Sequence, residues 1–300
     1  MRGYWPNIVL LAAVWGASYL FIKVAVDELE PAPMMAVRTL LAAAVLGIYL
    51  GLRIGWRRAR TDLRAAWRHC LVLGVLNAAL PFWLIAWGEK HIDSGLAAVV
   101  QASVPIFNAL LVLRFLPHER LSASRALGLG VGIVGVGVVT GLSPGGGWIA
   151  VGGALAIVGS SIAYAGAGVY GQIAVSDTAG PVLATGSMLL GGLILLPIAL
   201  FQIPTAVPSW EATASVLALS LLGTAFAQLV LFRTLALYGS ARLSLVTYLM
   251  PAFALVYGAL ILDEAITAAT LLGGALILAG VALASGTLRR PRRAADPVRT

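Results

Sequence analysis

Long apolar runs alternate along this chain with short breaks that carry charges, glycine or proline. An α-helix crosses the hydrocarbon core of a bilayer in about 20 residues, and each run is close to that length. The runs are continuous and lack the strict apolar–polar alternation of a half-buried strand. They predict an all-α membrane protein with ten transmembrane helices near residues 5–26, 33–52, 69–88, 94–113, 124–142, 149–173, 179–201, 212–233, 240–262 and 267–287.

The first run follows Arg2, as the apolar part of a secretion signal would. It extends from Trp5 to Val26, which is long enough to span, and no small-x-small cleavage site precedes the polar residues after it. We therefore expect the first membrane helix here. Composition agrees, because 60% of the residues are hydrophobic and only 11% are charged. The single cysteine, Cys70, excludes an intrachain disulfide.

The basic residues give the direction of the helices. If the N-terminus is cytoplasmic, all of the 20 lysines and arginines except Lys23, Arg38 and Lys90 fall in cytoplasmic segments or next to them. This bias sets orientation in membrane proteins and predicts a multi-pass protein with both termini in the cytoplasm. The net charge of +8 therefore serves topology and contacts with the lipid bilayer, and we expect no binding to nucleic acid.

Two similar halves follow one another in the sequence. Ser94 and Ser240, Pro105 and Pro251, and Glu119 and Glu264 are matching positions about 145 residues apart. We divide the chain into a first five-helix repeat (1–145), a second repeat (146–288) and a basic cytoplasmic tail (289–300). Because five is odd, the second repeat must enter the membrane from the other side, which predicts two inverted repeats.

The chain resembles EamA-type transporters of the drug/metabolite transporter superfamily. The resemblance rests on Trp15-Gly16-Ala17-Ser18, on residues 36–40, which read Ala-Val-Arg-Thr-Leu, and on the repeated order of proline and acidic residue. It implies two inverted five-helix halves around a central cavity and export of amino acids or other small metabolites across the bacterial inner (cytoplasmic) membrane. The first helix lacks the buried glutamate that the small multidrug exporters of this superfamily carry.

Polar and aromatic residues inside apolar runs are the candidates for substrate binding, because such residues are costly in lipid. Pro105 and Pro251 each free the carbonyl of the residue four positions earlier, Gln101 and Thr247. Helical spacing would place Asn108 on the face of Gln101. The predicted substrate-binding residues are Trp15, Tyr19, Asn77, Trp83, Trp87, Gln101, Asn108, Tyr164, Gln228, Thr247 and Tyr248.

The charged positions near the membrane have two interpretations. Arg38 would pair with Asp27, Glu28 or Glu30 as an external gate, or it would hold a substrate carboxylate. Together with Pro105 and Pro251 it forms the predicted gating set. Lys23 is expected to extend outwards to water. The acidic residues Glu119 and Glu264 are expected to begin helices as structural hinges, with Ser122 and Thr267 as helix caps.

We predict a carrier that exports small metabolites, most of all amino acids, by alternating access around a midplane cavity. Export of nucleosides, nucleotide-sugars or drugs, a channel, and a structural membrane protein remain alternatives. No phosphate loop, zinc-ligand pair or Ser/His/Asp set is present, so we expect neither an enzyme nor a metal or cofactor. No carboxylate lies in the middle of a run, so a proton relay is not visible. The partner is a small-molecule substrate, and the chain acts as a monomer or a weak homo-oligomer.

Overall fold

The computed structural model describes residues 3–116, 122–141, 147–175 and 178–284, and these contain helices and no strand. In the first half the helices are α1 (Trp5–Val26), α2 (Pro31–Ile54), α3 (Trp56–Ala65), α4 (Trp67–Gly74), the π-helix η1 (Val75–Ala79), α5 (Leu80–Glu89), α6 (Ser94–Gln101), α7 (Val104–Phe115) and α8 (Ala123–Gly141). In the second half they are α9 (Gly147–Ala174), α10 (Gly180–Leu200), α11 (Trp210–Ser220), the π-helix η2 (Leu221–Phe226), α12 (Ala227–Tyr238), α13 (Ser240–Leu243), α14 (Leu245–Ile261) and α15 (Ala268–Ala284).

Eight helical segments of the described chain are long and apolar enough to cross a membrane, and α14 and α15 are apolar but shorter. Three of the eight are composite: α4, η1 and α5 form one segment, α6 and α7 form a second, and α11, η2 and α12 form a third. All ten predicted runs therefore coincide with apolar helical segments. The proposed boundary between the repeats at 145 and 146 and the tail 289–300 lie outside the described residues.

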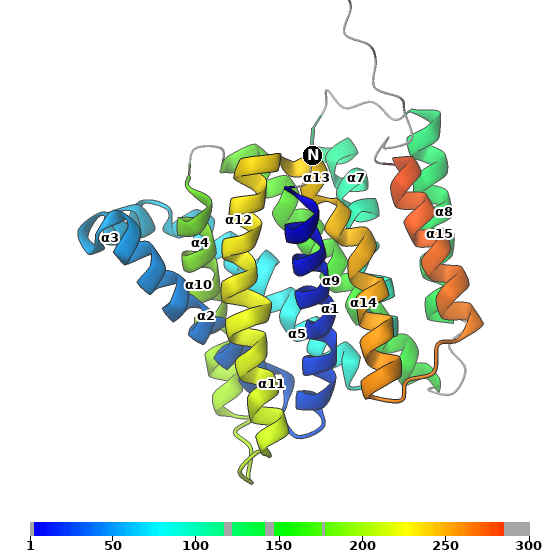
Figure 1. Ribbon diagram of the computed structural model, residues 1–300, viewed down its shortest axis with the longest axis horizontal. Coiled ribbons are helices and arrows are strands. Elements are labelled where there is room, and N and C mark those ends of the chain that lie inside the picture. Colours follow the sequence, from blue (N-terminus) through cyan, green and yellow to red (C-terminus); the bar gives the residue numbers. More distant parts are fainter. Residues whose placement is uncertain (1–2, 117–121, 142–146, 176–177, 285–300) are drawn as a thin grey trace, which may run out of the picture.

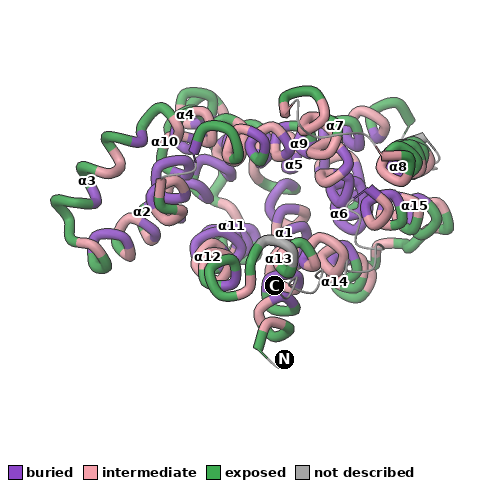
Figure 2. Tube along the Cα trace, turned by 90° about the horizontal axis from the view of Figure 1, so that it is seen from above, coloured by how far each residue is buried: buried purple, intermediate pink, exposed green. Residues whose placement is uncertain are grey.

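The helices run up and down between two ends of the bundle (Figure 1). We call the end where α1 begins the amino-terminal face and the end where α1 finishes the opposite face. The first helix of the second half, α9, begins at the opposite face. α3 lies at the edge of the bundle, where it contacts α2, α4 and α10 (Figures 1 and 2). The arginine-rich helix α3 occupies the stretch between the second and third predicted runs.

The two halves pack on each other in a reciprocal way. The second helix of one half packs on that of the other, α2 on α10, and the fifth helices α8 and α15 form a further pair. The first helix of each half packs on the fourth segment of the other, α1 on α14 and α9 on α6 and α7. Exchanging the halves leaves this set of contacts unchanged. Buried residues gather on the inner sides of these helices (Figure 2).

Special backbone conformations occur at matching places in the two repeats. The π-helices η1 and η2 begin at Val75 and Leu221, again about 145 positions apart. The two proline positions differ: Pro105 begins α7 after a break that follows Gln101, whereas Pro251 lies inside the continuous helix α14. The repeats therefore share a sequence pattern and adopt different local conformations at the fourth segment.

The α8–α15 pair depends on close backbone contact. A Cβ atom added at Gly128 would lie 2.6 Å from the Gly280 carbonyl oxygen and 2.6 Å from the Ala284 nitrogen. These are backbone atoms, so the helices themselves would have to move apart. Small residues commonly permit such approach between membrane helices. Gly130 lies on the same helix, and a Cβ added there meets no atom within 4 Å.

We predict that Gly128→Ala lowers the thermal unfolding midpoint in detergent by several degrees, because it separates α8 from α15. The control Gly130→Ala should leave the midpoint unchanged or raise it, since alanine is favoured over glycine in a helix by about 1 kcal/mol. Fluorescence-detected size-exclusion after heating measures both variants. Equal midpoints for the two variants would contradict the close α8–α15 contact.

Candidate functional site

A cavity of about 490 Å³ lies inside the bundle between the two halves. Small-molecule sites usually enclose about 300–1,000 Å³ and combine apolar walls with a few polar groups. This cavity follows that pattern, because its lining is mostly apolar and both halves contribute to it. Its polar and aromatic lining side chains include Trp15, Ser18, Tyr19, Arg38, Asn77, Phe82, Gln101, Tyr164, Ser187, Thr224, Gln228 and Thr247.

The cavity extends toward the amino-terminal face. Its lining reaches Gly180 and Val246, which lie in the first turns of α10 and α14 at that face. At the other end its lining reaches Ile22 and Ile85, and beyond them several polar contacts tie the helix ends together. The cavity is thus bounded more firmly toward the opposite face than toward the amino-terminal face.

Glu264 makes the most extensive contact at the opposite face. Its carboxylate accepts hydrogen bonds from the Ser94 backbone nitrogen at 2.7 Å, the Ser94 hydroxyl at 2.9 Å and the Gly95 nitrogen at 3.0 Å. A carboxylate near a helix N-terminus is favoured by the free N–H groups and the helix dipole. Glu264 therefore caps α6 of the first half although it belongs to the second half.

Three further contacts lie at the opposite face. Lys23 donates to the backbone carbonyls of Glu89 at 2.8 Å and Ile92 at 3.0 Å. The expectation that Lys23 extends outwards to water is wrong, since its ammonium group completes the unpaired carbonyls at the end of α5. Two surface pairs also lie here: Lys90 pairs with Glu30 at 2.7 Å, and Glu28 accepts from the Ser209 nitrogen and hydroxyl.

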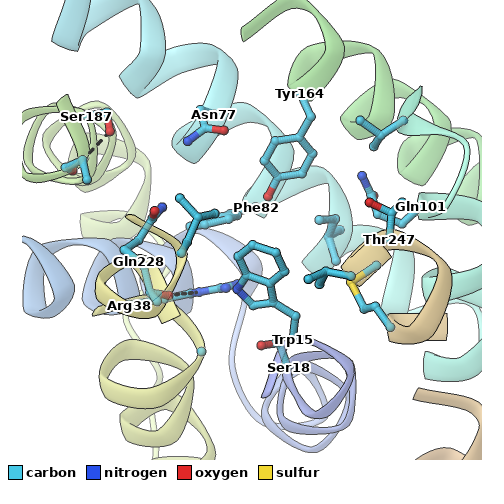
Figure 3. Close-up of a pocket in the computed structure, with 18 of the residues that line it drawn as sticks. Trp15, Ser18, Arg38, Asn77, Phe82, Gln101, Tyr164, Ser187, Gln228 and Thr247 are labelled. Carbon is cyan, nitrogen blue, oxygen red and sulfur yellow. Dashed lines mark hydrogen bonds between the residues drawn. The ribbon is translucent and has the colours of Figure 1, made fainter. Parts of the chain in front are cut away.

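Glu28 and Glu30 of the first loop therefore bind Ser209 and Lys90 rather than Arg38, and the described residues contain no ion pair between Asp27 and Arg38. The hydrogen bonds from Ser209 lower the pKa of the exposed Glu28 carboxyl below its ordinary value. The predicted ion pair between Arg38 and Glu28 or Glu30 is absent from the part of the chain that the structure describes. Arg38 points inward to the cavity instead (Figure 3).

Arg38 is the basic side chain among the described residues that line the cavity. It is 5% exposed, and its Nε donates to the Thr224 hydroxyl of η2 at 3.0 Å. Its guanidinium carbon lies 3.9 Å from the centre of the Phe82 ring, a cation–π distance. Within the described residues no carboxylate forms a salt bridge with it. Its Nη1 also donates to the Met35 sulfur at 3.8 Å, and these contacts together orient the guanidinium at the cavity wall.

Gln101 offers a second donor at the cavity wall. Its amide oxygen accepts a hydrogen bond from the Ser160 hydroxyl of α9, which orients the side chain. Its amide nitrogen is buried and has no hydrogen-bond partner among the described residues. A buried donor without a partner is costly, so a ligand that accepts from it would be favoured. The helix break after Gln101 places this amide at the end of α6.

The structure brings together many of the residues predicted from sequence. The predicted site residues that line the cavity come from α1, α2, η1, α6, α9, α12 and α14. They are Trp15, Tyr19, Arg38, Asn77, Gln101, Tyr164, Gln228 and Thr247. Figure 3 shows all of them except Tyr19 labelled around a common space.

The other predicted site residues lie outside this lining. Trp87 packs edge-on against His91 with ring centres 4.8 Å apart, and the Asn108 amide lies next to Gly168 of α9. Trp83 and Tyr248 pack against the hydrophobic core. The predicted gating prolines are likewise absent from the lining: Pro105 is half-buried in the first turn of α7, and Pro251 is buried within α14.

Helix irregularities explain these differences. The expectation that Asn108 shares a face with Gln101 assumed one straight helix, but the chain turns at Ala102 and Ser103 between α6 and α7. The π-helix η1 adds a wide turn before Trp83, which also changes its direction relative to Asn77. The prolines predicted an irregularity in the fourth helical segment, but they did not predict that the helix breaks there.

The predicted substrate-binding set does not include three side chains that the structure places at the cavity. Phe82 and Thr224 hold Arg38, and Ser187 contributes a hydroxyl from α10. Thr224 could have been found as the position four before Gln228. The predicted caps are present: Ser122 accepts from the Arg125 nitrogen at 3.3 Å and Thr267 from the Thr270 nitrogen at 3.1 Å. Glu119 lies outside the described residues.

The fold and the cavity define a helical membrane protein with an internal site for a small molecule. The model of the EamA-like transporter family matches residues 6–141 and again 151–286. This chain belongs to the EamA-like transporter family.

Curated relatives carry transporter names. Over 304 residues the chain is 30% identical to the "Probable terminal-alkyne amino-acid exporter" of Streptantibioticus cattleyicolor, covering 97% of both chains. It is 27% identical over 279 residues to an "Uncharacterized transporter" of Archaeoglobus fulgidus, covering 92% of this chain and 96% of the relative. It is 29% identical over 222 residues to the inner membrane transporter YedA of Escherichia coli K12, covering 72% and 69%.

A solved crystal structure has the same fold. It superimposes with a TM-score of 0.65 at 22% sequence identity, covering 93% of this chain and 96% of the other. The two family matches and the transporter names of these relatives indicate a membrane transporter.

A thiol-accessibility experiment checks the openness of the cavity. We predict that Thr247→Cys, on the cavity wall, reacts with a charged methanethiosulfonate reagent added from the amino-terminal face. Thr234→Cys should react an order of magnitude more slowly, because Thr234 is buried away from the cavity and bonded to Val230. The buried native Cys70 supplies the baseline. Equal rates for the two variants would show that the cavity is not open on this side.

Proposed function

We propose that the protein exports small zwitterionic metabolites, above all amino acids, by alternating access of its two halves around the cavity. The observation that carries the proposal is the Arg38 guanidinium, which faces the cavity without a carboxylate partner in the described residues. A carboxylate is the natural ligand of such a group, because a guanidinium can form two parallel charge-assisted hydrogen bonds with it.

The surroundings of Arg38 suit the rest of an amino acid. The Gln101 amide nitrogen is a free donor for a carboxylate or carbonyl oxygen. The rings of Trp15, Tyr19 and Tyr164 line the same cavity and can attract a ligand ammonium through their faces. The remaining wall is apolar, which fits a hydrophobic side chain. The amino-acid exporter among the relatives agrees with this substrate class.

The reciprocal packing of the halves supports alternating access. An inverted repeat can adopt the same pair of local conformations in either order, so one fold supplies two states that open to opposite faces. The fourth segments already differ, since the first is broken before Pro105 and the second is continuous through Pro251. In this scheme the structure represents the state open toward the amino-terminal face, and breaking the Glu264 contacts with Ser94 and Gly95 opens the other side.

We propose ten membrane spans, with both termini in the cytoplasm of a bacterial cell and the protein in its inner membrane. The distribution of arginine supports this orientation, and the transporter YedA is named as an inner membrane protein. The amino-terminal face is then cytoplasmic, and loading from the cell interior fits export. One chain encloses the cavity, so a monomer or weak homo-oligomer suffices.

Other substrates fit less well. Nucleotide-sugars carry phosphates that favour several cationic groups. Arg38 is the one cationic side chain among the described residues that line the cavity. Nucleosides and apolar drugs would leave its guanidinium without a counter-charge. A channel would not show saturable uptake that an internal pool stimulates, and a purely structural protein would not need the polar cavity.

The decisive variants change arginines on the same helix. Purified protein in liposomes should exchange a labelled amino acid against an internal pool, and Arg38→Ala should slow this exchange at least about tenfold, the effect of losing one charge-assisted bond of about 1.5–3 kcal/mol. Arg38→Lys should recover only part of the rate because a lysine cannot form the bidentate pair.

The matched control is Arg53→Ala at the end of α2, where the guanidinium packs over Tyr49 away from the cavity. It should transport as wild type does. Normal exchange by a well-folded Arg38→Ala protein, or the absence of exchange of every amino acid by wild type, would refute the proposal.

A further inference from the structure

Glu89 is a buried carboxyl group that the proposed binding site does not use. It is the last residue of α5 and is 0% exposed. Both carboxyl oxygens are buried and have no hydrogen-bond partner among the described residues. Lys23 is adjacent, but its ammonium group donates to the backbone carbonyl of Glu89 and to that of Ile92. The carboxyl group itself receives no bond.

This environment favours the neutral acid. A carboxylate buried without donors loses its hydration and gains no hydrogen bond in return, so burial disfavours the charged form. The charged and titratable groups around it are Tyr19 and Lys23 on α1, Arg38 on α2 and Glu264 before α15. The two cations favour ionisation and Glu264 opposes it. None of them forms a salt bridge with Glu89 within the described residues.

The position of Glu89 connects it to the opposite face. The two carbonyls held by Lys23 frame the turn between α5 and α6, and Glu264 caps α6 directly after this turn. Opening this face requires these contacts to separate, which admits water to the end of α5. Ile85, one turn earlier on α5, lines the cavity. Glu89 therefore lies between the cavity and the contacts that close the opposite face.

We propose that Glu89 is a proton-binding site that couples closure of the opposite face to protonation. In the closed state the side chain is a carboxylic acid. When the face opens, water reaches the group, the proton leaves to that water, and a carboxylate remains; reclosure takes one proton back. The inference rests on the alternating access of the proposed function. Each closure then binds one proton from the solution at the opposite face.

The pH dependence separates Glu89 from Glu264. Ionisation of Glu89 favours opening, so the open population rises with pH, by at most about tenfold per pH unit for one proton. Loss of the Glu264 bonds to Ser94 and Gly95 opens the same face at every pH, so it changes the open population without changing this slope.

The test measures opening without any substrate. Nitroxide labels at Asp27→Cys and Ala265→Cys, both exposed at the opposite face, report the distance across it by pulsed electron resonance in a Cys70→Ala background. With Glu89 intact, a longer distance should gain population between about pH 5 and about pH 9. Glu89→Gln, which mimics the neutral acid in shape, should remain closed over the whole range.

Two controls complete the design. Glu211→Gln removes an exposed acidic residue at the same face and should keep the wild-type slope. Glu264→Gln should raise the open population at every pH and keep the slope. A pH-independent distance with Glu89 intact overturns the proposal, whether or not Glu89→Gln folds, and so does an unchanged slope in Glu89→Gln. Amino-acid exchange by wild type in liposomes, measured separately, would then still support the exporter.

Discussion

The arrangement depends on a cation held inside an apolar bundle. Arg38 is 5% exposed, and burying its charge is costly unless other groups compensate. The Thr224 hydroxyl and the Phe82 ring supply part of that compensation, from the second half and the first half respectively. In the proposed function, a ligand in the cavity supplies the remaining compensation for this buried charge. A protein that holds a positive charge in this way is prepared for a negatively charged group and gains binding energy when it arrives.

The second feature on which the structure depends is the difference between the polar contacts at the opposite face and the apolar helix pairs. Each contact that closes the opposite face joins segments distant in the sequence, and the most extensive one joins Glu264 to the start of α6. Such contacts are local and polar, and they can break without disturbing the apolar pairs α2–α10 and α8–α15. The rigid pairs and the separable caps together give a bundle that can hinge about its central cavity.

Much of the fold could be predicted from the sequence because membrane spans depend on local composition. The repeated prolines and acidic residues also located the fourth segment and the helix start in both halves. The predictions that failed concern side-chain directions, which depend on backbone geometry that has no clear signal in the sequence. The wide turn of η1 and the break at Ala102 redirect Trp83 and Asn108, and no apolar pattern announces either. Glu89 directly follows the third predicted run, where an exposed residue is expected, whereas tertiary packing buries it fully.

The central claim is that Arg38 receives the carboxylate of a small metabolite. The most direct measurement is thermal stability of the purified protein with amino acids and with the matching amines that lack the carboxylate, since a ligand stabilises the fold that binds it. The account predicts that at least one amino acid raises the unfolding midpoint with concentration, that its amine does not, and that the rise disappears in Arg38→Ala. Equal stabilisation by the amine, or an undiminished rise in Arg38→Ala, would contradict it.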